Sequence, residues 1–384
     1  MFRHMPFILI GIILFAGIFS PMLPTACKAS LYAVSLSLKD MIIFVLPLII
    51  FGLLFKTAVQ LARKATGTIL LIFGGVCCSN FLSTWISYSV GRVAYQMDLS
   101  MVVPNKENLL VPTWLFPLPK WIGNDHAMLS GLILGLGFAL FAPQAARSIS
   151  TFLEKMVGLI LKGILFAIPF FILGFVLKLS HEGTLVQLLQ DYAGILAVVA
   201  GTIFTYIAVL YFAANKFNVR ASIKSIGNML PAALTGLGSM SSAAAMPLTI
   251  LGAEKNARDP DIARSIIPAT VNIHMIGDSL AIPIFAFAVM KNFGVAEPFV
   301  LAYLQFSLYF VVAKFSAAAV PGGGILVMLP ILESKMGFDP GMLSLITALH
   351  ILFDPVITCA NVLGNGAFAQ IIDRLQARKK TVSL

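Results

Sequence analysis

Apolar segments long enough to cross a membrane alternate with short polar connections through the first half of the chain. A membrane-spanning helix needs about 20 mostly apolar residues. By that measure we predict six spans before residue 215: Phe7–Leu23; Met41–Phe55, extended by an amphipathic tail over Thr57–Lys64; Gly67–Val90; a fourth span in pieces from Met101–Trp121 and Ala127–Phe141; Leu153–Leu179; and Ala193–Ala214. The serine-rich segment Gly67–Val90 is expected to turn its polar side toward protein or water.

Glycine and proline interrupt two apolar segments in the second half of the chain. Residues 223–252 are broken around Ser239–Pro247, and residues 299–335 are broken around Val320–Gly324. Neither half of either segment is long enough to span a bilayer. We therefore predict two re-entrant helical hairpins with their tips at these breaks.

Each predicted hairpin is followed by an apolar segment with polar groups at its middle. The first is Ile262–Met290, which we expect to be interrupted near Gly277 and Asp278, and the second is Met342–Ile372. A broken hairpin followed by a polar-centred helix, occurring twice, is how secondary transporters build a site at mid-membrane. The pattern predicts an all-α polytopic membrane protein with about eight transmembrane helices and two hairpins.

Composition agrees with a membrane protein. Of the 384 residues, 59% are hydrophobic and 11% are charged, and the mean hydropathy is +0.95. Soluble domains carry about 25% charged residues. The net charge of +10 does not indicate nucleic-acid binding, because the basic residues lie at the ends of apolar segments. The four cysteines have no metal-ligand spacing, so neither a disulfide framework nor a metal site is indicated.

Lysine and arginine placement predicts the topology. Basic residues are denser on alternate connections, which the positive-inside rule assigns to the cytoplasm together with both termini. The N-terminal segment also has the outline of a signal peptide, with Arg3 before the apolar run and Cys27 within a small-residue stretch, so that cleavage near residue 27 is the alternative to a first helix.

Four motifs follow one another in the second half. They are the serine-rich run Ser239–Pro247, Thr270-Val271-Asn272, Val320-Pro321-Gly322-Gly323-Gly324, and Asp354-x-x-x-Thr358-x-x-Asn361. In this order and spacing the chain resembles the dicarboxylate/amino acid:cation symporters, which include the glutamate transporter homologues. The resemblance covers nearly the whole chain.

The resemblance implies an elevator-type homotrimer with inverted repeats in an inner or plasma membrane. The scaffold helices 1 and 2 would occupy residues 1–66 and scaffold helices 4 and 5 residues 93–180. Transport helix 3 would occupy residues 67–92, and transport helices 6 to 8 with both hairpins residues 181–384. No organic cofactor and no nucleic-acid partner is implied.

The resemblance also implies a substrate site. Ser242 matches a hairpin-tip position that binds the substrate's α-carboxylate, and free N–H groups at such a tip attract carboxylates. Asp354 matches the aspartate that holds the substrate's amino group. The candidate substrate-binding residues are Ser241, Ser242, Ser279, Val320, Pro321, Gly324, Asp354, Ile357, Thr358 and Asn361.

Each of these features also has a purely structural interpretation. Ser241 and Ser242 could belong to a packing stripe of small residues, which is common where membrane helices approach closely. The tip Val320–Gly324 could be an ordinary extracellular loop rather than a gate. Asp354 with Pro355 could cap a helix.

Two positions depart from the family pattern. Ile357 stands where members that carry acidic substrates have an arginine, and isoleucine cannot make a bidentate contact with a carboxylate. We therefore expect a neutral or small amino acid rather than aspartate or glutamate. Asn365 stands where sodium-coupled members have a cation-binding aspartate, so that one sodium site is weakened.

The coupling ion is open between H⁺ and Na⁺. His274 stands four residues before Asp278, so the two could face each other on a helix as a proton carrier. Lys314 lies near another family sodium site, where its ammonium would exclude sodium; the alternative is snorkelling to an interface. The candidate coupling residues are Thr270, Asn272, His274, Asp278, Lys314, Asn361, Asn365, Ser83 and Thr84.

These observations predict a secondary active transporter of a small carboxylate-bearing solute, driven by H⁺ or Na⁺, and not an enzyme. An ion-independent exchanger and a sensor that has lost transport are alternatives. An intramembrane serine hydrolase is a third, since one of Ser239, Ser241 and Ser242 together with His274 and Asp278 would supply the residue types of a triad, although the chain has no nucleophile-elbow motif.

Overall fold

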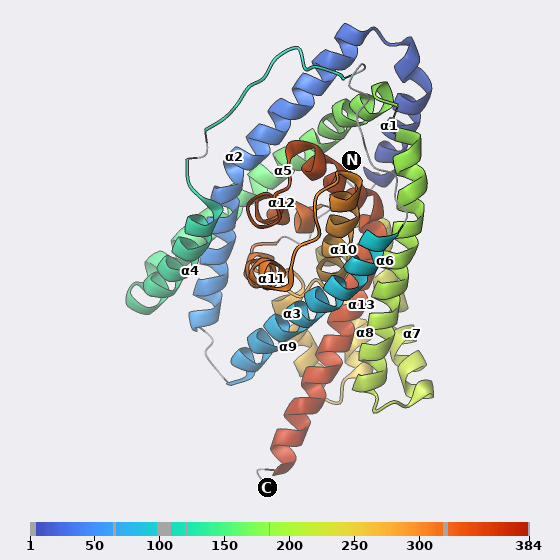
Figure 1. The fold of residues 1–384 in the computed structure, drawn as a ribbon. Helices are drawn as coiled ribbons and strands as arrows, with labels where there is room; N and C mark the ends of the chain where they lie inside the picture. The colour runs from blue at the N-terminus through green and yellow to red at the C-terminus, as the bar shows by residue number, and fades with distance from the viewer. Residues whose placement is uncertain are drawn as a thin grey trace.

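The computed structural model describes residues 5–63, 67–97, 109–119, 121–183, 185–317 and 322–382. Within these ranges the chain forms helices joined by short connections, and no strand occurs (Figure 1). The α-helices are α1 (Met5–Phe19), α2 (Thr25–Arg63), α3 (Gly67–Gln96), α4 (Asn124–Phe141), α5 (Pro143–His181), α6 (Leu185–Ala214), α7 (Val219–Ser239), α8 (Ser242–Asn256), α9 (Pro260–Thr270), α10 (Ile276–Asn292), α11 (Val300–Lys314), α12 (Gly323–Met336) and α13 (Pro340–Val382), and the short 3₁₀ helix η2 (Ser20–Met22) follows α1.

Helices α2, α4 and α5 pack along one another, and α1 packs on α5 (Figure 1). Glycine permits the close approach of α4 to α2. A Cβ atom at Gly131 would lie 2.8 Å from the carbonyl oxygen of Phe51, and one at Gly135 would lie 2.7 Å from that of Phe55. Small residues four apart are a common means of bringing membrane helices together.

The predicted start of the second span at Met41 is wrong, because α2 begins at Thr25 and is 39 residues long. Between Thr25 and Met41 the sequence holds neither glycine nor proline, so nothing stops the helix. The polar side chains in this stretch find partners instead: Lys28 donates to the carbonyl oxygen of Ser20 at 3.3 Å.

The predicted helical piece Met101–Trp121 is also wrong over the described residues 109–119, which form no helix. Pro112, Pro117 and Pro119 account for this, because proline lacks the N–H and clashes with the preceding turn. Residues 101–108 lie outside the described residues. Among the described residues, α4 carries the fourth span, and α5 begins at Pro143, ten residues before the predicted Leu153.

The two predicted hairpins are present as α7–α8 and α11–α12. The first turns at Met240, whose φ is 52°, and Ser241 caps α8 by accepting a hydrogen bond from Ala244 N. In the second hairpin, Gly322 precedes α12 as its N-cap. Its φ of 69° lies in the left-handed region, which glycine adopts without strain.

The interruption after the first hairpin lies between α9 and α10, at residues 271–275, and not near Gly277 and Asp278 as predicted. Side chains from other helices stabilise this break by binding its free carbonyl groups. Asn80 of α3 donates to Ile273 O at 2.8 Å, and Asn365 of α13 donates to His274 O at 3.1 Å. Gly277 and Asp278 therefore belong to the first turn of α10.

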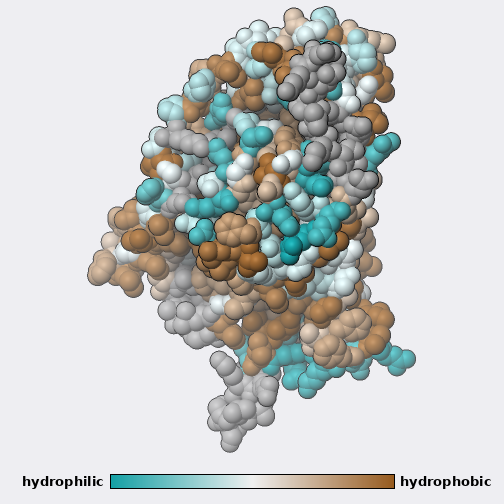
Figure 2. Space-filling model, viewed as in Figure 1, coloured by the Kyte–Doolittle hydropathy of each residue, from teal (hydrophilic) through white to brown (hydrophobic). Residues whose placement is uncertain are grey.

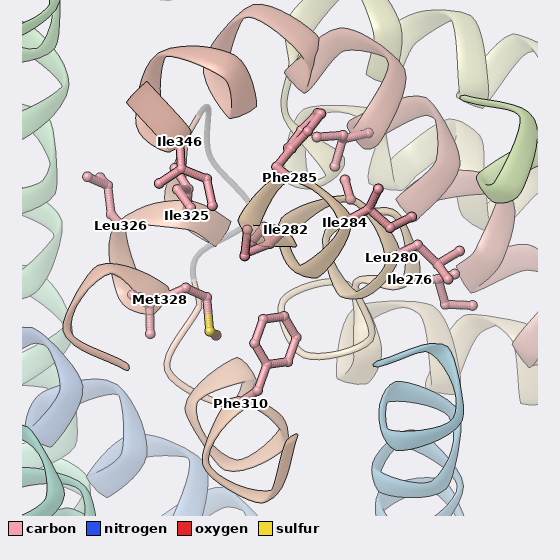
Figure 3. Close-up of a cluster of buried hydrophobic side chains, with 14 of the residues drawn as sticks. Ile276, Leu280, Ile282, Ile284, Phe285, Phe310, Ile325, Leu326, Met328 and Ile346 are labelled. Carbon is pink, nitrogen blue, oxygen red and sulfur yellow. The ribbon is translucent and has the colours of Figure 1, made fainter. Parts of the chain in front are cut away.

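Helix α10 is the centre of the molecule, since all of its residues except Lys291 are buried. It packs against α3, α6, α12 and α13. Figure 3 shows Ile276, Leu280, Ile282 and Phe285 of this helix among apolar side chains of α11, α12 and α13. A polar group on α10 is therefore shielded from solvent by helices on several sides.

Five of the described helices are long and apolar enough to cross a membrane: Thr25–Val59, Leu71–Gln96, Pro143–His181, Tyr192–Ala214 and Pro340–Gln376. The remaining predicted spans fall on the shorter helix α1, on α4 and on the broken pair α9–α10. Apolar residues cover much of the outer face in Figure 2, and hydrophilic residues gather at its lower edge near α7. The chain is an all-α polytopic integral membrane protein.

Candidate functional site

Asp278, in the first turn of α10, is the centre of a buried polar network. Its Oδ1 accepts a hydrogen bond from His350 Nε2 of α13 at 2.8 Å, and its Oδ2 accepts one from Asn361 Nδ2 of α13 at 2.7 Å. Lys314 Nζ of α11 lies 3.8 Å from the same Oδ1. All four side chains are at most 2% exposed, so this network joins α10, α11 and α13 in the interior.

Lys314 is the last residue of α11, and its side chain is fully buried. The snorkelling interpretation is therefore wrong. Its Nζ lies 5.1 Å from the centre of the Phe310 ring and, within the described residues, has no hydrogen-bond acceptor. A buried ammonium is costly unless it is paired, which makes Asp278 its compensating charge.

Gly324 brings the second hairpin against this network. A Cβ atom at this position would overlap the carboxylate of Asp278. The run of glycines at the start of α12 therefore serves close packing as well as the turn at Gly322.

Gly324→Ala is expected to weaken the packing of the second hairpin against α10, because the added methyl group must displace Asp278 or α12. Such overpacking typically costs about 1–3 kcal/mol. We expect a lower midpoint of thermal unfolding in detergent. The matched control is Gly201→Ala on α6, where a Cβ would meet no atom within 4 Å; equal behaviour of the two variants would contradict the close contact.

Asp354 is a second buried carboxylate, in the interior of α13. Its Oδ2 accepts from Gly322 N at 2.8 Å, and its Oδ1 accepts from Thr358 Oγ1 at 3.0 Å. The helix continues from Pro340 to Val382, so the interpretation of Asp354 as a helix cap is wrong. The contact with Gly322 joins this residue to the start of the second hairpin.

The first hairpin reaches the same face of α13. A Cβ atom at Gly236 of α7 would lie 3.4 Å from Thr358 O and 3.5 Å from Thr358 Cγ2. Ser242 opens α8 and is buried, and Ser241 is its N-cap. Ile357 is fully buried on α13, where it leaves the site without a guanidinium.

The predicted pairing of His274 with Asp278 is not found, because His274 lies outside the helix that carries Asp278. His274 lies in the break before α10, where its Nε2 is 2.9 Å from Ser79 Oγ and its ring packs 4.4 Å from that of Phe368. Asp278 lies on α10 and is bonded to His350.

Asn365 and Asn361 support the backbone around the break. Asn365 Nδ2 donates to His274 O at 3.1 Å and to Asn361 O at 3.0 Å, while Asn361 Oδ1 accepts from Gly277 N at 2.8 Å. The Asn365 amide donates N–H groups to backbone carbonyl oxygens, which a carboxylate at residue 365 could not do.

Several other candidate residues have hydroxyl groups bonded to their own helix or segment. The hydroxyls of Ser83, Thr84, Thr270 and Ser279 all donate to a carbonyl four residues earlier. Asn272 is exposed in the break. Val320 and Pro321 lie outside the described residues.

His350 was not among the predicted site residues. The signal was its position, since residues 350, 354, 358, 361 and 365 follow at spacings of four or three and so lie on one face of a helix. The sequence alone does not reveal which charged residue pairs with a lone histidine in an apolar segment. The partner is Asp278, which comes from another helix.

The hydrolase interpretation also fails on geometry. His274 is bonded to Ser79, and Asp278 to His350 and Asn361, so the proposed triad with Ser242 is not assembled in the described residues.

Comparison with known proteins places this site in a family. Excitatory amino acid transporter 1 of Rattus norvegicus is 28% identical over 234 residues, which are 59% of this chain and 41% of the relative. The human protein of the same name is 27% identical over 278 residues, which are 68% of this chain and 49% of the relative. The chain thus spans about half the length of the curated relatives it matches.

The model of the sodium:dicarboxylate symporter family matches residues 125–375. That match holds α4 to α13 almost completely, and with them both hairpins, the broken helix and every member of the Asp278 network. With well over half of its length matched, the chain belongs to the sodium:dicarboxylate symporter family.

Proposed function

We propose that this protein is a secondary active transporter that moves a small carboxylate-bearing solute, a neutral or small amino acid rather than aspartate or glutamate. The observation that carries the proposal is Asp354, a carboxylate 4% exposed and bonded to Gly322 N and to the hydroxyl of Thr358. Within the described residues, no lysine or arginine makes an ion pair with it. A carboxylate inside a membrane protein is costly unless a cation pairs with it, and the ammonium group of an amino acid can be that cation.

The substrate's own carboxylate would lie at the tip of the first hairpin. Ser241 and Ser242 stand at the N-terminus of α8, where the helix dipole favours an anion. The fully buried Ile357 has no group to bind a second carboxylate, which supports a neutral amino acid over an acidic one.

The proposed transport is an elevator-type motion in an inner or plasma membrane, with both termini cytoplasmic and a homotrimeric assembly. The grouping of α1, α2, α4 and α5 supports the scaffold. The packing of α3, α6, α12 and α13 against α10, with α7 and α8 packed on α13, supports the moving part. The alternative is ion-independent exchange, which the internal ion pair of Lys314 and Asp278 favours because it occupies the site with a fixed cation.

A thermal-shift screen tests the proposal. Purified protein is heated with each common amino acid and with small carboxylic acids, with and without sodium, at two pH values. Binding to the folded state raises apparent stability, by about 2.7 kcal/mol at a hundred times Kd. Stabilisation by neutral amino acids and not by amine-free acids is expected; no stabilisation by any of them contradicts the proposal.

Asn365→Asp is expected to create a sodium requirement. The substitution removes two N–H donors and places a carboxylate against the carbonyl oxygens of His274 and Asn361. The two carbonyl oxygens and the oxygens of the new carboxylate are ligands that a hard cation prefers. Without a cation, we expect a loss of about 2–4 kcal/mol, since a buried unpaired charge group costs more than a neutral hydrogen bond.

Sodium should restore the thermal midpoint of Asn365→Asp and leave that of the wild type unchanged in the absence of substrate. The control is Asn365→Ser, which removes the donors without adding charge and should not respond to sodium. A sodium response of the wild type equal to that of Asn365→Asp would contradict the weakened site.

A further inference from the structure

The Asp278 network contains a titratable group, His350, that was not among the residues predicted from the sequence. We propose that His350 is the proton-binding residue that couples transport to a proton gradient, with Asp278 as its counter-ion. This inference rests on the proposed function, because it names the coupling ion of the same site.

The geometry of His350 suits a proton site. Its Nε2 lies 2.8 Å from Asp278 Oδ1, and both side chains are buried. Its Nδ1 has no hydrogen-bond partner within the described residues. In a neutral ring with the proton on Nε2, that nitrogen is the acceptor, and an incoming proton binds there and makes the ring a cation. Histidine is the side chain whose charge ordinarily changes between about pH 5 and 8.

The charges of the site require one more cation. The site contains one lysine, Lys314, and two buried carboxylates, Asp278 of the network and Asp354 beside it on α13, so that one negative charge is in excess while His350 is neutral. An amino acid with one ammonium and one carboxylate leaves that excess unchanged. A proton on His350 removes it, and uncompensated charge inside a membrane protein is costly.

The charged groups around His350 come from three helices. Asp278 faces it from α10, Lys314 approaches the same carboxylate from α11, and Asp354 stands one turn along on α13. Helix α12 brings Gly324 to this carboxylate, and its buried residues are apolar. His274 does not belong to this group, because it is bonded to Ser79.

Proton binding to His350 would also affect the second hairpin. His350 Nε2 and Lys314 Nζ approach the same oxygen, Asp278 Oδ1, at 2.8 and 3.8 Å. A protonated imidazole makes a stronger, charge-assisted bond to that oxygen. The carboxylate is then held more firmly by α13 and less by Lys314, which ends α11. Protonation of His350 therefore loosens the tie between α10 and the second hairpin.

The test uses the full chain in sodium-free proteoliposomes with a ¹⁴C-labelled mixture of the twenty L-amino acids as the probe. With an inward proton gradient of one pH unit, wild-type vesicles should accumulate label by about tenfold over vesicles without a gradient, because one pH unit is worth 1.36 kcal/mol per proton. An added sodium gradient should not increase accumulation further.

His350→Gln should abolish this accumulation and keep counterflow, the exchange of label against unlabelled mixture inside the vesicles, within about threefold of wild type. Glutamine can still donate to Asp278 but cannot hold the proton. The matched control is His126→Gln, an exposed histidine on α4, which should behave as wild type in both assays.

Three results would overturn the assignment: wild-type accumulation that ignores the proton gradient, accumulation by His350→Gln equal to wild type, or loss of accumulation in His274→Gln instead. Absence of counterflow in the wild type would overturn the proposed function itself. If His350→Gln fails to elute as a folded protein, His350→Asn replaces it.

Discussion

Asp278→Asn is expected to lower the free energy of unfolding by about 3–5 kcal/mol, the usual cost of removing one partner of a buried ion pair. The asparagine can still accept from His350, but it leaves the ammonium of Lys314 buried without a compensating charge. Its amide also sets an NH₂ group against the NH₂ group of Asn361. The measurement is chemical or thermal unfolding of the purified protein in detergent.

A double variant separates the charge from the packing. Asp278→Asn combined with Lys314→Met removes both charges and should recover at least about half of the lost stability, since residues of one buried network show interaction energies of about 0.5–3 kcal/mol. The matched control is Asp261→Asn, the same change in a carboxylate that pairs with Arg264 at the surface, which should leave the thermal midpoint unchanged. Wild-type stability in Asp278→Asn would show that Lys314 and Asp278 are not a charged pair.

Much of the fold could be predicted from the sequence, because glycine and proline mark where apolar segments are interrupted. The breaks at Ser239–Pro247 and Val320–Gly324 predicted two hairpins, and α7–α8 and α11–α12 are these hairpins. The position of the break before α10 could not be predicted in this way. It depends on Asn80 and Asn365, which come from distant helices and bind its carbonyl groups.

The start of α2 was predicted too late in the chain. Hydropathy placed the helix at Met41, where the apolar run begins, although the helix itself begins at Thr25. A hydropathy pattern measures which residues lipid can surround. It does not measure where a helix ends, because a polar stretch without glycine or proline continues the helix beyond the apolar part.

The candidate site could be predicted along one helix and not between helices. The spacing of Asp354, Thr358 and Asn361 placed them on one face of α13, and Asp354 and Thr358 are hydrogen-bonded there. The partner of Asp278 was assigned by spacing to His274, four residues earlier, but the backbone leaves the helix between them. His350 and Lys314 reach Asp278 from elements 72 and 36 positions away in the chain.

Asp354→Asn is expected to lower the affinity for amino acids by about a hundredfold or more, which corresponds to about 2.8 kcal/mol at 1.4 kcal/mol per tenfold. The loss follows from removing the only group proposed to neutralise the substrate's ammonium in a buried site, where truncating one partner of a charge pair costs about 2–5 kcal/mol. Binding is measured by thermal shift over a range of concentrations of each stabilising amino acid.

The structure allows this variant to keep its fold, which makes the result specific to binding. Asparagine Oδ1 can accept from Gly322 N, and its amide can donate to the hydroxyl of Thr358, which is now free to accept. The stability without ligand should therefore fall by less than that of Asp278→Asn. The control substitution is again Asp261→Asn, at an exposed carboxylate. An undiminished response of Asp354→Asn to amino acids would place the ammonium of the substrate elsewhere, whereas an equal loss for amine-free acids would make Asp354 a structural residue of the second hairpin and not a ligand for the amine.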